Sequence, residues 1–323
     1  MKTGKDLLQQ FHRLSLSLLP TPLHKLNNIS ADVARNVYCK RDDLTGFAFS
    51  GNKTRKLDFL IADALRQNAD TCIAVGAVQS NFCRMAAAGK VNNLDVHLVL
   101  GGKKPEKATG NLLLDNLFGA NIHFVESDNW DRWEEYAASL EPQLSANGKK
   151  VYRTPVGGST PIGVLGYVDA FLELIEDCRR MNITIDTIVH ASSSGGTQAG
   201  LIVGKVLSGW RGRIIGMGVA KSQMQLSNEI LNLAAETGKL FGVSIDKRDV
   251  IVDNAFMGPA YAAQTNECET ACRIFAQTEG IVLDNVYTGK AAAGLFEYIH
   301  RGLISPNENV VFIHTGGVVE VFE

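Results

Sequence analysis

The stretch DTIVHASSSGGTQAGLIVGKVLSG, residues 186–209, indicates the fold class of this chain. It opens with a run of apolar residues, passes through the small residues SSSGG, and continues into a helical pattern. A nearly continuous apolar run that ends in serine and glycine before a helix is typical of a parallel strand covered on both faces. We therefore expect a strand over 186–193, a tight turn over 192–200 and a helix over 197–209.

The same strand, turn and helix unit recurs along the chain. Further strands are predicted at 71–76, 95–102, 121–126, 213–220 and 309–317. Helical patterns lie at 53–67, 81–92, 109–118, 130–145, 161–181, 222–238, 265–279 and 289–302. This alternation indicates an α/β architecture of open, twisted, mainly parallel sheets flanked by helices. A segment rich in Gly, Pro and Ser at 154–163 is the best candidate boundary between two groups of such units.

Length and composition are those of an ordinary globular protein. The 323 residues suffice for one large domain or two medium ones, and 45% of them are hydrophobic. A net charge of −2 gives no reason to expect a nucleic-acid or membrane surface, and no apolar run is long enough for a transmembrane helix. We interpret residues 1–20, which lack a small-residue cleavage site, as an amphipathic first helix of a cytosolic protein.

The six cysteines indicate a reducing compartment rather than a metal centre. Cys39 and Cys72 lie in apolar runs, so we expect them to be buried. Cys268 and Cys272 are four residues apart on a predicted helix, but no second Cys or His pair stands at a matching spacing. We therefore expect no metal site, reduced thiols and a cytoplasmic location.

The turn at 192–200 has the properties of a phosphate-binding loop. Its glycines allow the backbone to approach an anion closely, and the following helix N-terminus adds partial positive charge. The turn lacks the Lys-Ser/Thr of a P-loop and the G-x-G-x-x-G pattern, which disfavours nucleoside triphosphates and dinucleotides. A glycine-rich turn of this kind can also serve tight packing alone, so a monophosphate site is a hypothesis.

A second turn, FSGNKTRKLDFLIADAL at 49–65, places Lys53 where the chain enters a helix. One interpretation is a helix cap with a basic first turn. The other is a reactive amine, because a helix N-terminus and the neighbouring cations Arg55 and Lys56 would destabilise its ammonium form. A reactive lysine and a monophosphate site together suggest pyridoxal phosphate, which needs an amine, a phosphate anchor and partners for its ring.

Five ordered motifs then carry a family resemblance. They are KRDDLTGFAFSGNKTRKLDFLIADAL, GAVQSN, GGTQAG, VYTGKA and FIHTGG, and they extend from about residue 20 to residue 322. The chain resembles the family of D-cysteine desulfhydrases and 1-aminocyclopropane-1-carboxylate deaminases. The resemblance implies pyridoxal 5'-phosphate as cofactor, the tryptophan-synthase β-type fold (PLP fold type II) and a homodimer. It also implies a large cofactor-binding domain at 1–47 plus 166–323, and a smaller domain at 48–165 carrying Lys53 and Asn81.

The resemblance assigns cofactor-binding roles to residues of these motifs. Lys53 matches the Schiff-base lysine, and Asn81 matches the residue that hydrogen-bonds the ring hydroxyl of the cofactor. Thr315 matches a hydroxyl partner of the pyridine nitrogen. The phosphate loop corresponds to Ser194, Gly195, Gly196 and Thr197. Asn81 would also make a good helix cap and Thr315 would suit a strand end, so both have a purely structural alternative.

Four residues are candidates for catalysis under the same resemblance. Lys53 or Ser80 would remove the α-proton of the substrate, and the residues leave both possibilities open. Ser80 also matches a serine that binds the substrate carboxylate, although a helix cap is its ordinary role at such a turn. Tyr287 matches a tyrosine stacked near the substrate side of the ring, and Tyr261 is a second candidate phenol. Both tyrosines also suit a packed position with a backbone partner.

Two threonines favour β-elimination over cyclopropane ring opening. The deaminases of the family resemble V-Y-E-G-K with leucine before the final Gly-Gly, whereas Thr288 and Thr315 stand at these positions here. A neutral hydroxyl at the ring nitrogen does not enforce its protonation, so the ring is a weaker electron sink. Elimination of a good β-leaving group tolerates such a sink. The expected reaction is D-cysteine plus water to pyruvate, hydrogen sulfide and ammonia.

Departures from the family pattern leave the substrate open. Phe82 and Cys83 follow Q-S-N where histidine is common, and Asn285 replaces the proline of D-P-V-Y. The alternatives are a 1-aminocyclopropane-1-carboxylate deaminase, a lyase for another β-substituted amino acid such as L-cysteate, and a catalytically silent pyridoxal-phosphate-binding protein. The expected partner is a small amino acid in every enzymatic case.

Overall fold

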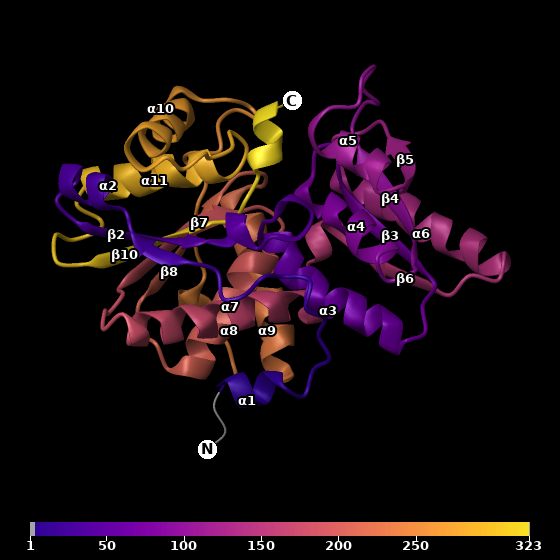
Figure 1. Cartoon of the computed structure of the whole chain (residues 1–323), viewed down its shortest axis with the longest axis horizontal. Coiled ribbons are helices and arrows are strands. Elements are labelled where there is room, and N and C mark those ends of the chain that lie inside the picture. Colours follow the sequence, from indigo (N-terminus) through magenta and orange to yellow (C-terminus); the bar gives the residue numbers. More distant parts are fainter. Residues whose placement is uncertain (1–3, 323) are drawn as a thin grey trace.

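The computed structural model describes residues 4–322 and contains two sheets (Figure 1). Within these residues, the six-stranded sheet has the order β1 (Leu23–Lys25), β2 (Asn36–Arg41), β10 (Asn309–His314), β7 (Thr187–Ser192), β8 (Arg213–Gly218) and β9 (Ile251–Asp253). The four-stranded sheet has the order β5 (Asn121–Val125), β4 (Asp95–Gly101), β3 (Thr71–Ala77) and β6 (Val151–Thr154). Strand β1 pairs with β2 antiparallel and every other pairing between described strands is parallel. The expected α/β class with mainly parallel sheets is confirmed.

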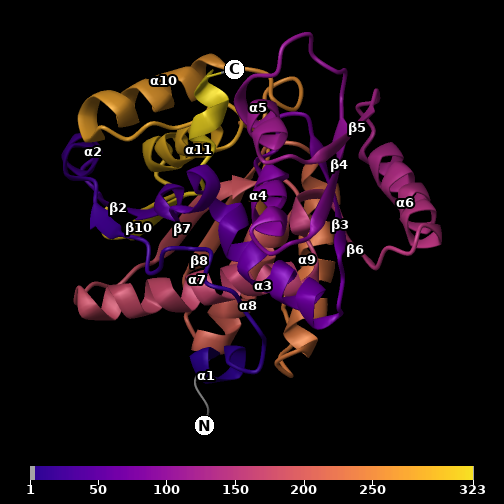
Figure 2. The same cartoon turned by 45° about the vertical axis from the view of Figure 1, so that its right-hand side comes forward.

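Helices cover both faces of each sheet (Figures 1 and 2). Those beside the six-stranded sheet are α1 (Gly4–Leu8), α7 (Pro161–Arg180), α8 (Gly196–Ser208) and α9 (Gln223–Lys239) on one face, and α2 (Asn27–Asp32), α10 (Asn266–Ile274) and α11 (Thr288–His300) on the other. Those beside the four-stranded sheet are α3 (Asn52–Arg66), α4 (Arg84–Lys90) and α5 (Gly110–Leu117) on one face, and α6 (Trp130–Ala146) on the other. This double coverage explains why the central strands β3 and β7 are buried along nearly their whole length.

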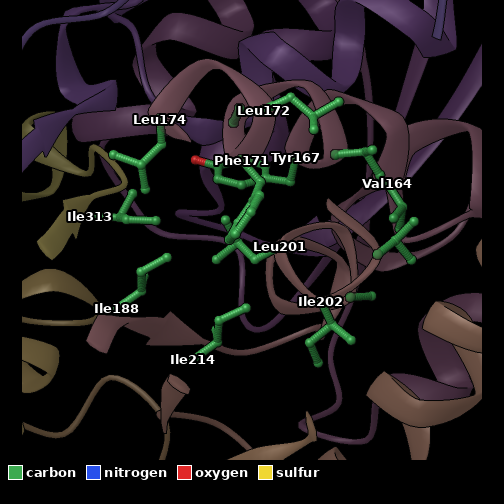
Figure 3. Close-up of a cluster of buried hydrophobic side chains, with 14 of the residues drawn as sticks. Val164, Tyr167, Phe171, Leu172, Leu174, Ile188, Leu201, Ile202, Ile214 and Ile313 are labelled. Carbon is green, nitrogen blue, oxygen red and sulfur yellow. The ribbon is translucent and has the colours of Figure 1, made fainter. Parts of the chain in front are cut away.

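The core beneath the six-stranded sheet fixes the position of α8. Side chains of α7 and α8 meet residues of β7, β8 and β10 in one buried cluster (Figure 3). Two glycines of α8 allow the close approach, because a Cβ on Gly200 would lie 2.5 Å from Tyr167 Cβ and one on Gly204 would lie 2.5 Å from Phe171 Cβ. The N-terminus of α8 is therefore held rigidly against α7.

A buried ionic network joins the two sheets through α3, α7 and β2. Arg55 on α3 lies 2.8 Å from Asp42 and 2.8 Å from Glu173. Lys40 on β2 contacts the same Glu173 at 2.6 Å and Asp177 at 2.5 Å. Each buried charge has an oppositely charged partner. The network therefore fixes the orientation of α3 relative to α7 and β2.

One local expectation was wrong, and four strands were missed. The amphipathic first helix expected over 1–20 ends at Leu8 within the described residues, and the chain then runs irregularly along α3. Backbone N–H groups of Leu14 and Leu16 donate to Asp58, at 2.8 Å to its carbonyl and 2.7 Å to its carboxylate. The alternating leucines of this segment suit an extended path with one apolar side better than a helix. The strands β1, β2, β6 and β9 were also not predicted.

The positions of two cysteines agree with the sequence prediction. Cys39 and Cys72 are fully buried, as predicted. No helix in the described part of the chain has both the length and the apolar character needed to cross a membrane.

Candidate active site

A pocket lies beyond the carboxyl ends of β3 and β7, between the two sheets. Of the residues proposed from sequence, it is lined by Lys53, Ser80, Asn81, Ser194, Gly195, Thr197, Tyr261, Tyr287 and Thr315. Gly196, the remaining one, begins α8 directly behind the loop. Segments that are far apart in the sequence therefore meet at the edge where ligands bind in parallel α/β sheets.

The turn before Lys53 is held against the end of β10. The backbone N–H of Asn52 donates to Thr315 O at 2.8 Å, and a Cβ on Gly51 (φ +106°) would lie 3.1 Å from the same oxygen. Phe49 and Ser50 also have positive φ angles, 64° and 65°, which are uncommon for residues with side chains. The surrounding contacts thus impose a specific path that brings Lys53 into the first turn of α3, facing the pocket.

Burial controls the charge of the Lys53 amine. It lowers the pKa of Lys53 to about 8, and the carboxylate of Glu320 acts in the opposite direction. The expectation that Arg55 would destabilise the Lys53 ammonium was wrong, because Arg55 is neutralised by its buried carboxylate partners. The Lys53 Nζ atom lies 3.4 Å from Gly157 O and 5.9 Å from the centre of the Phe82 ring. A neutral amine is therefore accessible near pH 8.

Lys56 lies behind the start of α8, against Gly196, and was not proposed as a ligand from sequence. A Cβ on Gly196 would lie 2.5 Å from Lys56 Nζ, and this Nζ donates to Gly157 O at 3.1 Å. Burial and then the charge of Lys53 lower the pKa of Lys56 well below its usual value. The sequence did contain a signal for this position. Residues three apart share a helix face, and Lys56 follows Lys53 at that spacing.

The residues around the glycine turn fit a phosphorylated aldehyde such as pyridoxal phosphate. Gly195 has φ +79° and caps the N-terminus of α8, where backbone N–H groups lack helical partners. The Ser192 hydroxyl lines the pocket, is 2% exposed, and has no hydrogen-bond partner among the described residues. A buried unpartnered donor beside an anion-binding helix end and an amine matches the groups that this cofactor offers.

Asn81 forms a hydrogen bond that sequence analysis did not predict. Its Nδ2 donates to Glu320 Oε1 at 2.6 Å, while Asn111 Nδ2 faces its Oδ1 at 3.5 Å. Ser80 caps the short helix 81–83 by accepting from the Phe82 N–H at 3.2 Å, which agrees with the structural alternative for this serine. The Asn81 side chain makes no such cap and faces the pocket instead.

The two tyrosines form one hydrogen-bonded pair. The hydroxyl of Tyr261 bonds to that of Tyr287, and the Tyr261 ring makes an edge contact with Trp130. Burial, followed by the influence of Tyr261 and Glu320, raises the pKa of Tyr287 well above 10. Tyr287 is therefore a neutral phenol that can donate a hydrogen bond but is not a base at neutral pH.

Of the two threonines used to choose the reaction, Thr315 faces the pocket and Thr288 does not. Thr315 is 7% exposed and lines the cavity. Thr288 is fully buried, and its hydroxyl donates to Asp284 Oδ1 at 2.5 Å. The same carboxylate accepts the backbone N–H of Tyr287 at 2.6 Å. Thr288 therefore belongs to the support of the Tyr287 turn rather than to the pocket wall.

Known proteins are similar to this chain over nearly its whole length. Residues 14–316 match the family model described as "Pyridoxal-phosphate dependent enzyme". A putative 1-aminocyclopropane-1-carboxylate deaminase of Pyrococcus furiosus is 40% identical over 98% of this chain and 95% of the relative. A D-cysteine desulfhydrase of Yersinia enterocolitica is 38% identical over 98% of this chain and 96% of the relative.

Solved structures agree with these sequence relatives. The crystal structure of a 1-aminocyclopropane-1-carboxylate deaminase homologue superposes with a TM-score of 0.93 at 37% identity, covering 100% of this chain and 97% of the other. The processed form of threonine deaminase isoform 2 from Solanum lycopersicum superposes with a TM-score of 0.68 at 19% identity. This match covers 98% of this chain and 86% of the other, and the likeness concerns the fold alone.

Proposed function

The chain belongs to the pyridoxal-phosphate dependent enzyme family, and from this premise we propose that it eliminates the β-substituent of a small amino acid, with D-cysteine as the substrate. The products are then pyruvate, hydrogen sulfide and ammonia. The observation that carries the proposal is the meeting of the Lys53 amine and the N-terminus of α8 in one pocket. The cofactor is pyridoxal 5'-phosphate, and the chain is a lyase that depends on it.

Each part of the cofactor has a candidate partner in this chain. Lys53 would supply the amine that holds the cofactor covalently, and the Asn81 amide would hydrogen-bond its ring hydroxyl. Thr315 offers a hydroxyl to the pyridine nitrogen. The loop Ser194, Gly195, Gly196 and Thr197 binds the phosphate, and the Lys56 amine behind it offers a further hydrogen-bond donor. When bound, the cofactor withdraws electrons from the α-carbon of the amino acid attached to it.

The chain's own residues then move the protons. Lys53 Nζ and Ser80 Oγ are the two candidates for accepting the α-proton, and the pKa of about 8 makes the Lys53 amine a competent base near neutral pH. Tyr287, a neutral phenol, donates a hydrogen bond toward the substrate side. The same Lys53 amine, once protonated, is placed to return a proton when the product leaves.

Thr315 supports elimination over ring opening. A threonine hydroxyl does not hold a proton on the pyridine nitrogen as a carboxylate would, so the ring stabilises a carbanion less strongly. Elimination that expels a good leaving group needs that stabilisation less than cyclopropane opening does. The second candidate, 1-aminocyclopropane-1-carboxylate deamination, is kept because a relative carrying that name is 40% identical.

Product analysis separates these candidates. Purified protein is offered D- and L-amino acids with β-leaving groups, including cysteine, β-chloroalanine and cysteate, together with 1-aminocyclopropane-1-carboxylate. We expect pyruvate, ammonia and sulfide in equal amounts from D-cysteine. α-Ketobutyrate from the cyclopropane substrate as the dominant product would establish the deaminase instead, and no keto acid from any substrate would establish a silent binding protein.

A substitution tests the role of Lys53 directly. Because general-base catalysis contributes roughly 10²–10⁴-fold, Lys53→Ala is expected to lower turnover by at least that factor. Lys90→Ala removes a partly exposed lysine of the same domain and is expected to retain full activity. Full lyase activity in Lys53→Ala would refute the assignment.

The organisation of the molecule completes the proposal. We propose a large cofactor-binding domain at 1–47 plus 166–323 and a smaller domain at 48–165, acting as a homodimer in the cytoplasm. The six cysteines, all free thiols in the structure, are consistent with a reducing compartment. Sedimentation equilibrium of the purified protein tests the dimer.

A further inference from the structure

Glu320 is a buried carboxylate that contacts Asn81, a residue of the active-site pocket wall. It lies in the last short helix, Val318–Phe322, and is 9% exposed. Its Oε1 accepts a hydrogen bond from Asn81 Nδ2 at 2.6 Å. Glu320 lines the adjoining outer pocket together with Gln79 and Tyr261, whereas its partner Asn81 lines the active-site pocket. Carboxylates are rarely buried without a specific partner.

The contact with Glu320 defines which way the Asn81 amide points. An asparagine amide has one oxygen acceptor and two N–H donors, and its flip is set by its neighbours. The carboxylate of Glu320 can only accept, so it selects the Nδ2 side, and Asn111 Nδ2 faces the Oδ1 side at 3.5 Å. One N–H of Asn81 is thereby directed to Glu320, and the second remains for an acceptor in the pocket.

Glu320 also acts electrostatically on Lys53. Its negative charge favours the ammonium form of Lys53 and opposes the effect of burial on the pKa. Among the described residues, the other titratable groups at this site are Lys56 on α3 and the phenols Tyr261 and Tyr287. Arg55 is paired with Asp42 and Glu173 and does not face the amine. Among these titratable groups, Glu320 is therefore the one that carries a negative charge.

We propose that Glu320 is a positioning residue of the cofactor site: it holds the Asn81 amide with a donor toward the cofactor, and its carboxylate adds negative charge behind the pocket wall to which Asn81 and Lys53 both belong. The proposal rests on the proposed role of Lys53 as the amine that holds the cofactor. Two separable effects follow. The hydrogen bond governs how tightly the cofactor is held, and the charge governs the pH at which Lys53 becomes reactive.

Two substitutions separate these effects. Glu320→Gln keeps an oxygen acceptor for Asn81 and removes the charge, whereas Glu320→Ala removes both. The full-length protein is stripped of cofactor and reloaded with pyridoxal 5'-phosphate at pH 6 to 10, and the rate of adduct formation and the equilibrium affinity are followed by absorbance. Only the neutral amine reacts, so the rate rises with pH until Lys53 is deprotonated. Glu135→Gln, on the exposed face of α6, is the charge control.

We expect Glu320→Gln to move this rate profile to lower pH, raising the rate at pH 6 by roughly three- to tenfold, since a tenfold change accompanies each unit of pKa. Its cofactor affinity should stay within about twofold of the unchanged protein. We expect Glu320→Ala to show the same shift and to bind the cofactor at least about tenfold more weakly. Glu135→Gln should match the unchanged protein in both respects.

The following results would contradict the proposal for Glu320. An unchanged rate profile in Glu320→Gln overturns the electrostatic part, and that variant decides the matter even if Glu320→Ala fails to fold. Unchanged affinity in a folded Glu320→Ala overturns the positioning part. If the unchanged protein forms no borohydride-reducible adduct at Lys53, the proposed function fails together with this inference. An adduct that forms normally in every variant sinks the inference alone.

Discussion

Lys53 and Lys56 lie one helical turn apart on α3 and contact the same carbonyl oxygen, Gly157 O, at 3.4 and 3.1 Å. Their surroundings nevertheless give them different chemistry. Lys53 opens into the pocket, whereas Lys56 is fully buried against Gly196 at the start of α8. An amine facing the cavity is available to a substrate or cofactor carbonyl, and an amine facing a helix N-terminus is suited to a bound anion.

Replacement of Lys56 tests this division of roles. Lys56→Met removes the amine donor and keeps much of the side-chain volume, so we expect cofactor affinity to fall by at least about tenfold. Adduct formation at Lys53 should persist at saturating cofactor, because the reactive amine is untouched. Absorbance titration of the stripped protein measures both quantities. Affinity equal to that of the unchanged protein would remove Lys56 from the phosphate site.

At the scale of elements, the N-terminus of α8 depends on the backbone conformation of Gly195. Its φ angle of +79° is disfavoured for residues with a side chain, and a Cβ there would lie 2.9 Å from Ile230 Cγ1 on α9. Gly209, at the C-terminal end of the same helix, has φ +70° but no atom within 4 Å of an added Cβ. A side chain would therefore strain the backbone at either position, but only at Gly195 would it also meet a steric contact.

This pair provides a matched test. We expect Gly209→Ala to reduce the free energy of unfolding by about 1 kcal/mol with unchanged cofactor affinity. Gly195→Ala should reduce it further and also weaken cofactor binding, because α8 must shift to relieve the contact with Ile230. Urea unfolding and cofactor titration give the two measurements. Equal behaviour of the two variants would show that the start of α8 does not position the phosphate.

The ionic network that orients α3 has a defined pH dependence. Burial alone would raise the pKa of Glu173, but hydrogen bonds and charge from Arg55, together with Lys40, lower it to about 2. The folded state therefore binds the proton of Glu173 less tightly than the unfolded chain does. The stability that this group contributes is present above the unfolded pKa of about 4.3 and is lost as the pH falls toward 2.

Glu173→Gln is expected to remove part of this acid sensitivity and to lower stability at pH 7. A buried Arg55 that loses one of its carboxylate partners costs on the order of a few kcal/mol. The free energy of unfolding measured between pH 3 and pH 7 gives both the loss and the slope. If the variant has the same slope as the unchanged protein, Glu173 does not titrate in this range as the geometry requires.

At the scale of the whole molecule, the cofactor pocket is shared between the two sheets. Lys53 and Asn81 come from the part of the chain that packs on the four-stranded sheet. Thr197 lies at the start of α8, which packs on the six-stranded sheet, and Thr315 directly follows β10 of that sheet. The sheets are also joined by α3 against α7, where Gly166 allows the backbones to approach. A bound cofactor therefore adds a further link between them.

We expect pyridoxal 5'-phosphate to raise the melting temperature by several degrees. At about 100 times the dissociation constant, binding to the folded state alone contributes about 2.7 kcal/mol, and about 1 kcal/mol shifts the melting temperature of a large domain by roughly 2–4 °C. Pyridoxine 5'-phosphate, which lacks the aldehyde, should give a smaller shift, and Lys53→Ala should respond equally to both compounds. Differential scanning calorimetry measures these shifts, and equal shifts in the unchanged protein would argue against a covalent link.

Much of the fold was predictable because its signals are local. The apolar runs that became β3, β4, β5, β7, β8 and β10 identify themselves by composition, as do the amphipathic helices between them. The strands β1 and β9 have three residues each and offer no run long enough to recognise. Residues 9–20 contain helix-favouring leucines, yet their path follows hydrogen bonds to Asp58 that no local pattern contains.

The sequence by itself determined the alternation of strands and helices, the glycine turn before α8 and the lysine at the start of α3, because each depends on neighbours within a few residues. Only the tertiary structure decided that Arg55 is withdrawn into an ionic network, that Lys56 reaches Gly196, and that Glu320 meets Asn81 across 239 positions of the chain. The physical reason is that burial and charge pairing depend on which surfaces pack together. A charged side chain has no defined environment until the fold supplies its neighbours.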